Sequence, residues 1–238
     1  MSRIRSILTN SYTLARYNVR IIFGGKFIYF ILAAFIFYLV FGTIMALDSD
    51  EIDLSEIYGL LAFPAILLVF YPTVFGIQAD ADQRTLEIIF GIPDYRYKVW
   101  LTRYIMILFI VFALLFPFAA LSYYALMSLP IIRMIGQLMV LVFFVSALGF
   151  CVSTIVKNGN ASAVIMVIFG LVFLILADGI EYSKWNIFLN PFQVPYDINE
   201  IVWQETIRQN RIIMGIASVV LLLLGLLNLQ QREKFLRS

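Results

Sequence analysis

The chain has 238 residues, of which 62% are hydrophobic and only 13% are charged, with a formal net charge of +2 and no histidine. Soluble domains carry about 25% charged residues, so this composition excludes an ordinary soluble domain and predicts an all-α integral membrane protein. The small net charge offers no large basic surface for nucleic acid. The lack of histidine excludes Ser-His and Cys-His catalytic pairs and HExxH zinc sites.

Residues 1–26 are predicted to form an amphipathic elbow helix that lies in the membrane interface before the first span. At helical spacing, apolar side chains fall on one face and Arg5, Arg16 and Arg20 fall together on another. Arginines on such a helix face lipid phosphates or a partner protein. The pattern leaves open whether this helix is a topology anchor or a partner contact.

Six apolar runs are long enough to span a bilayer, which takes about 20 residues per helix. They occupy a bundle at 27–229, inside a single transmembrane domain of residues 1–238 that continues into a tail at 230–238. Pro64, Pro72 and Pro117 are expected to kink or locally unwind the second and third spans. The predicted spans are Phe27–Leu47, Ile57–Gln78, Leu101–Met127, Met134–Val156, Ala161–Ile180 and Ile212–Leu229.

The distribution of lysine and arginine predicts the orientation of the bundle. Most of the 17 basic residues fall on the side that holds both ends of the chain, so both are expected in the cytoplasm. The opposite side holds Arg133, Lys184, Arg208 and Arg211, and also the acidic segment 48–56. Cys151 lies inside an apolar run and is expected to be a small buried side chain.

An external segment, 181–211, connects the fifth and sixth predicted spans. Apolar residues at 198, 201 and 202 suggest a short interfacial helix there. Aromatic anchoring at the headgroup level and a lid over an exit path both remain open for this segment.

The connection after the second span is predicted to contain a short cytoplasmic helix, Asp82–Gly91. Asp80 and Gln83 fit a helix start, and Gly91 followed by Pro93 fits a helix stop. This helix suits a groove in a partner protein, but a helix resting on lipid has the same pattern. Its apolar face holds Leu86, Ile89 and Phe90, and its other faces hold Gln83, Arg84 and Glu87.

The sequence shows no energy source of its own. It contains no glycine-rich Walker loop for ATP, and the predicted spans hold no ionisable residue at mid-depth. The chain is therefore expected to bind no cofactor and to catalyse no reaction.

The run DQRTLEIIFGIPDYRYKVWLTRY, beginning at Asp82, resembles the signature of type-2 ATP-binding-cassette exporter permeases. Arg84 stands directly before Thr85, where that family usually has glycine. The external segment Leu189, Asn190, Pro191 also resembles that family's proline-bearing external segment. The matching positions in the signature are Arg84, Thr85, Leu86, Glu87, Pro93 and Arg103.

The resemblance implies a permease subunit of an ATP-driven exporter in a bacterial inner membrane. Two permeases, identical or homologous, would form a dimer with cytoplasmic ATPase subunits that hold ATP and Mg. The first and fifth spans would meet the second permease. The implied ATPase-coupling residues are Asp82, Gln83, Arg84, Thr85, Leu86, Glu87 and Phe90, and the external gate candidates are Asn190, Pro191 and Phe192.

The cargo stays open between lipid-like, other hydrophobic and glycan molecules. The main alternative function is a non-transporting scaffold that anchors a cytoplasmic partner. A membrane enzyme acting on lipids is the least favoured, because the sequence shows no nucleophile constellation and no buried carboxylate pair.

Overall fold

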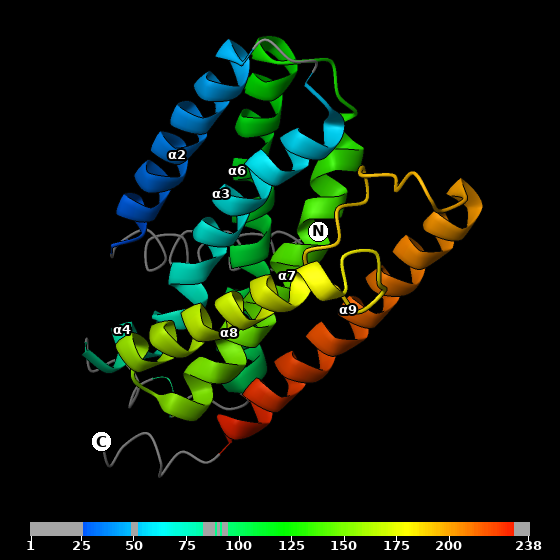
Figure 1. The fold of residues 1–238 in the computed structure, drawn as a ribbon. Coiled ribbons are helices and arrows are strands. Elements are labelled where there is room, and N and C mark those ends of the chain that lie inside the picture. The colour runs from blue at the N-terminus through cyan, green and yellow to red at the C-terminus, as the bar shows by residue number, and fades with distance from the viewer. Residues whose placement is uncertain (1–25, 49–51, 83–88, 90, 92–94, 231–238) are drawn as a thin grey trace, which may run out of the picture.

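The protein is all-helical over the residues that the computed structural model describes, which are 26–48, 52–82, 89, 91 and 95–230 (Figure 1). Six helical stretches are long and apolar enough to cross a membrane, which confirms the predicted multi-pass membrane protein. The elements are α2 (Phe27–Leu47), α3 (Leu54–Val74), α4 (Gly76–Asp82), a π-helix η1 (Arg96–Leu101), α6 (Thr102–Ala125), α7 (Ile131–Val156), α8 (Gly159–Gly179) and α9 (Glu200–Asn228).

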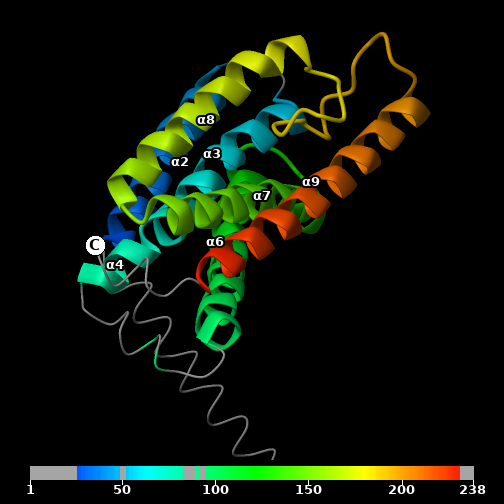
Figure 2. The same cartoon turned by 90° about the horizontal axis from the view of Figure 1, so that it is seen from below.

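Helix α7 lies at the centre of the bundle. It packs against α3, α6, α8 and α9, whereas α2 packs mainly against α3 (Figure 1). Figure 2 shows α6 and α8 on opposite sides of the α3–α7 pair. Two glycines allow α7 to approach its neighbours closely. A Cβ on Gly149 of α7 would lie 3.0 Å from Thr73 Oγ1 on α3, and a Cβ on Gly225 of α9 would lie 2.8 Å from the Phe150 ring on α7.

The alternating direction of the spans gives the bundle two ends. One end, here called the Asp80 end, holds α4, η1, the start of α8 and the last turns of α7 and α9. The other, here called the Arg211 end, holds the starts of α3, α7 and α9 and the segment 180–199 (Figure 1). Asp82 and Tyr95, which flank the segment 83–94, both lie at the Asp80 end.

Helices α2 and α8 contribute least to the core. Only 11% of the most apolar window of each is buried, against 67% for α7. Exposed isoleucines, valines, leucines and phenylalanines cover both helices. In a bilayer these faces contact either lipid or another protein.

The helix that contains the sixth predicted span begins 12 residues before that span. Helix α9 begins at Glu200, capped by the Asn199 side chain, and runs without a break into the apolar run after residue 211. No separate interfacial helix forms at 198–202, because Trp203 and Ile207, rather than Ile201 and Val202, face the interior. Of the predicted elbow helix only Lys26 is described, and of the predicted cytoplasmic helix only Asp82, Ile89 and Gly91 are; the rest of both lies outside the described residues.

The prolines leave their helices largely continuous. Pro64 and Pro72 lie within α3, and Pro117 lies within α6. The second span is interrupted only at Phe75, three residues after Pro72, where α3 ends and α4 begins. Cys151 is buried, as predicted.

Candidate functional site

A buried ion pair joins the second and third spans at the Asp80 end. Arg103 Nη1 lies 2.5 Å from Asp80 Oδ2, and the two residues are only 5% and 2% exposed. The guanidinium carbon of Arg103 also lies 4.9 Å from the centre of the Trp100 ring. Because a buried charge without its partner is costly, this pair holds α4 and the start of α6 in one arrangement.

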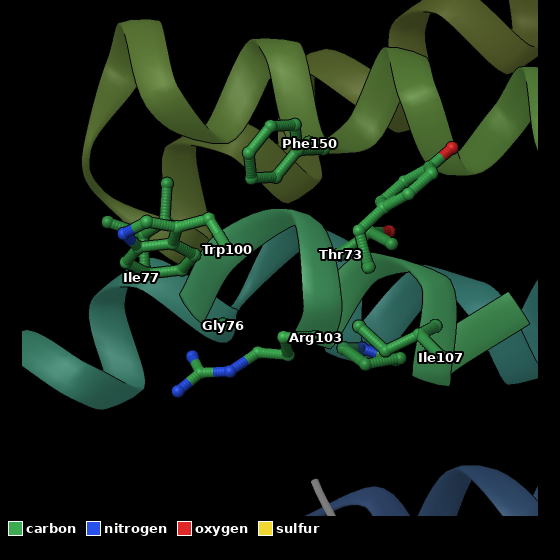
Figure 3. Close-up of a pocket in the computed structure, with 9 residues that line it drawn as sticks. Thr73, Gly76, Ile77, Trp100, Arg103, Ile107 and Phe150 are labelled. Carbon is green, nitrogen blue, oxygen red and sulfur yellow. The ribbon is translucent and has the colours of Figure 1, made fainter. Parts of the chain in front are cut away.

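A small cavity of about 10 Å³ lies beside this pair, where α3, α4, η1, α6 and α7 meet. Figure 3 shows Ile77, Trp100, Arg103 and Phe150 around it. Within the described part of the chain, Trp100 Nε1 and Arg103 Nε are buried donors without a hydrogen-bond partner. A space of this size holds about one water molecule, so it is no substrate pocket.

The Asp80–Arg103 pair lies just before the segment 83–94, and a second buried contact lies just after it. This contact is made by Tyr95, which is 3% exposed. Its hydroxyl donates a 2.5 Å hydrogen bond to the carbonyl of Leu229, just after α9 ends. Asn228 in turn donates to the carbonyl of Thr154 on α7 at 2.6 Å. The described residues on both sides of the segment 83–94 are therefore attached to the packed helices by buried or partly buried polar contacts.

A third contact brings α8 into the same assembly. The amide of Gly159, the first residue of α8, donates to Gln78 Oε1 on α4 at 2.5 Å. The chain can approach this closely because Gly159 has no Cβ, and an added one would lie 2.5 Å from the Gln78 oxygen. Helix α4, which immediately precedes the segment 83–94, thus contacts both α6 and α8.

The structure corrects one sequence-based expectation at this site. Asp80 does not stand at the start of a helix, because it lies inside α4 with its carboxylate on Arg103. Asp82 is the last residue of α4 and is exposed. The other expected coupling residues, 83–87 and 90, and the elbow arginines Arg5, Arg16 and Arg20 lie outside the described residues.

The external gate candidates lie at the Arg211 end, against α3. Asn190 donates from its side-chain amide to the carbonyl and the hydroxyl of Ser55, at 2.9 and 3.1 Å. Pro191 is buried, and the Phe192 ring lies 5.9 Å from the ring of Tyr58 on α3. These residues hold the segment 180–199 against the second span.

Asn210 and Arg211 on α9 hold the same segment, and sequence analysis did not single them out. Buried Asn210 donates to the carbonyls of Lys184 and Asn186, at 2.9 and 2.8 Å. Arg211 donates to the Leu189 carbonyl at 3.2 Å. A polar pair just before a long apolar run was the available signal, but the predicted span began at Ile212 and left it outside.

No family model, no curated protein and no solved structure matches this chain. The fold and the contacts at its two ends define a six-span α-helical membrane protein. They leave its function to be argued from the chain itself.

Proposed function

We propose that this chain is the transmembrane permease subunit of an ATP-driven exporter, coupled to a separate cytoplasmic ATP-binding-cassette ATPase. The resemblance of the run beginning at Asp82 suggests this function. The observation that carries the proposal is that the described residues on both sides of the segment 83–94 are attached to the bundle, by Asp80–Arg103 before it and by Tyr95–Leu229 after it.

In this proposal the Asp80 end faces the cytoplasm and the ATPase contacts residues 82–91. Closure of the ATPase pair around ATP and Mg displaces these residues. The Asp80–Arg103 pair passes that displacement to α4 and α6, and Tyr95 passes it to α9. Close-packed helices respond to such a displacement as rigid bodies rather than by local deformation.

A second permease copy, identical or homologous, would pack on α2 and α8. The support for this step is that these two helices bury the least surface within one copy. Their aliphatic and aromatic faces also suit a lipid-like or otherwise hydrophobic cargo, with glycans as the alternative. The membrane would be a bacterial inner membrane.

The proposal is tested by purifying the full chain from its native membrane and measuring the co-purifying ATPase activity. Glu87→Arg is expected to abolish stimulation of the ATPase by the permease, because it reverses a charge at the expected contact. Asp197→Arg is the matched control, since Asp197 is an exposed residue at the opposite end of the bundle. Normal ATPase docking and stimulation in Glu87→Arg would refute the coupling role.

The same preparation separates an exporter from a scaffold. A scaffold retains its cytoplasmic partner, but ATP hydrolysis by the complex does not respond to candidate cargo. In an exporter, hydrolysis changes when lipid or glycan cargo is added. A purified complex that contained no ATPase would count against the exporter and against a scaffold that anchors an ATPase.

The orientation is tested by cysteine labelling in a Cys151→Ser background. Ser183→Cys lies in the segment 180–199 and is expected to react with an impermeant reagent added outside the cell. Asn158→Cys, in the short connection between α7 and α8, is expected to react only after the membrane is opened. Reversed labelling would place the Asp80 end outside and end the proposal.

A further inference from the structure

Four basic residues lie at the Arg211 end, and among the described residues only Arg208 has an acidic partner. Arg208 pairs with Glu205 at 3.0 Å, and Lys184 donates to Gln209 Oε1 at 3.3 Å. Among the described residues, neither Arg133 nor Arg211 forms an ion pair within 4.0 Å. Besides Lys184, which contacts a neutral amide, this end of the bundle therefore holds two arginines whose charge no described carboxylate neutralises at contact distance.

Arg211 is partly buried, and its hydrogen bonds end on neutral groups. Its Nε donates to Gln137 Oε1 at 2.8 Å, and its Nη1 donates to Asn210 Oδ1 at 2.8 Å. Its Nη2 donates to a backbone carbonyl at 3.2 Å. These bonds satisfy the donors but leave the charge uncompensated, which is expensive in a partly dehydrated site.

Arg133 lies beside the same group of residues, one helical turn before Gln137 on α7. It is exposed, and its guanidinium carbon lies 5.7 Å from the centre of the Phe192 ring. The Phe192 ring lies 5.9 Å from the ring of Tyr58, which is next to Arg211. Arg133 also stands in the first turn of α7, where the helix dipole adds positive potential.

The two acidic residues at the start of α3, Asp53 and Glu56, form no ion pair with these arginines, and Asp53 accepts instead from the backbone amide of Leu54. Exposed apolar side chains lie next to both arginines in the sequence, with Ile132 80% exposed and Ile212 54% exposed. The surface thus combines uncompensated positive charge with exposed hydrocarbon at one end of the membrane spans.

We propose that this surface, formed by Arg133, Arg211, Gln137 and Phe192, binds the headgroup phosphate of an anionic membrane lipid. The phosphate neutralises the two guanidinium groups, and the exposed isoleucines contact the acyl chains. A free anion offers the same phosphate but gains nothing from the exposed hydrocarbon, which is why a lipid is the better occupant. This site does not depend on the exporter function or on the orientation of the bundle.

The test is native mass spectrometry of the purified full chain in detergent, titrated with phosphatidylglycerol. The wild-type chain is expected to retain the lipid, and Arg133→Gln to lower the bound fraction about fivefold at subsaturating lipid, which is the effect of one basic residue near a membrane surface. Arg208→Gln is the matched control, because it removes the same charge from the same end but from a residue already paired with Glu205.

Two further arms identify the source of the phosphate. Phosphatidylcholine, whose phosphate carries a compensating cation, is expected to bind more weakly than phosphatidylglycerol. Inorganic phosphate at the same concentration is expected not to displace the lipid. If inorganic phosphate did displace the lipid, the site would be assigned to a free anion and the lipid proposal would be overturned. Equal binding of both lipids, or equal loss in Arg133→Gln and Arg208→Gln, would overturn it as well.

Discussion

Replacing Asp80 with asparagine removes the only carboxylate in contact with Arg103 among the described residues, while keeping the size of the side chain. Both residues are almost fully buried, so bulk water does not reach the guanidinium to replace the lost carboxylate. Removing one member of a buried ion pair costs about 3–5 kcal/mol, because the other charge is left uncompensated. The Trp100 ring over the guanidinium is present with or without Asp80, so it does not replace the lost carboxylate.

The measurement is a double-mutant cycle on the unfolding free energy of the purified chain in mixed micelles. Asp80→Asn and Arg103→Met are each expected to destabilise the protein by several kcal/mol. The combined Asp80→Asn/Arg103→Met variant is expected to recover most of that loss, because neither substitution then leaves an uncompensated buried charge. The coupling energy should then be large.

Small effects in both single variants would refute this reasoning. An exposed ion pair contributes about 0–1 kcal/mol, so losses of that size would show that water reaches the pair. A double variant that is less stable than either single variant would show that packing around the cavity, rather than charge, holds α4 against α6.

Two further substitutions test the close contacts at the two ends of the bundle. Gly159→Ala is expected to lower stability by about 1–3 kcal/mol in thermal unfolding, because its Cβ would lie 2.5 Å from Gln78 Oε1, whereas Gly170→Ala, with open space around it, is expected to cause no loss. Asn210→Ala is expected to cost about 1–3 kcal/mol, because two backbone carbonyls lose their donor, and to speed proteolysis within 180–199. Exposed Gln204→Ala on the same helix should change neither quantity, and an equal effect would disprove the assigned role of Asn210.

The membrane spans could be predicted from the sequence because each needs only a long apolar run, which needs no knowledge of its neighbours. The first span was predicted with the bounds that α2 has in the structure, Phe27–Leu47. The start of α9 was missed because the helix continues through Asn210 and Arg211. These polar residues are tolerated inside a helix only because carbonyls and amides of other segments satisfy them.

The candidate site also has one part that could be predicted from the sequence and one part that could not. The motif beginning at Asp82 was visible in the sequence, since its residues are consecutive, but its coupling role remains a prediction. The Asp80–Arg103 pair joins residues 23 apart on two helices, and the local pattern at Asp80 instead favoured a helix start. Arg103, the tertiary partner of Asp80, overrode that local preference. A pattern in a single sequence does not reveal such a partner.

The central position of α7 sets how the sequence can vary. Because α7 touches α3, α6, α8 and α9, a bulkier side chain on it must displace several spans at once. The exposed faces of α2 and α8 are packed against no other described helix of the chain, so exchange among aliphatic and aromatic residues there displaces none of the described spans. Homologous chains should therefore differ most along these two peripheral helices and least along the helix that they surround.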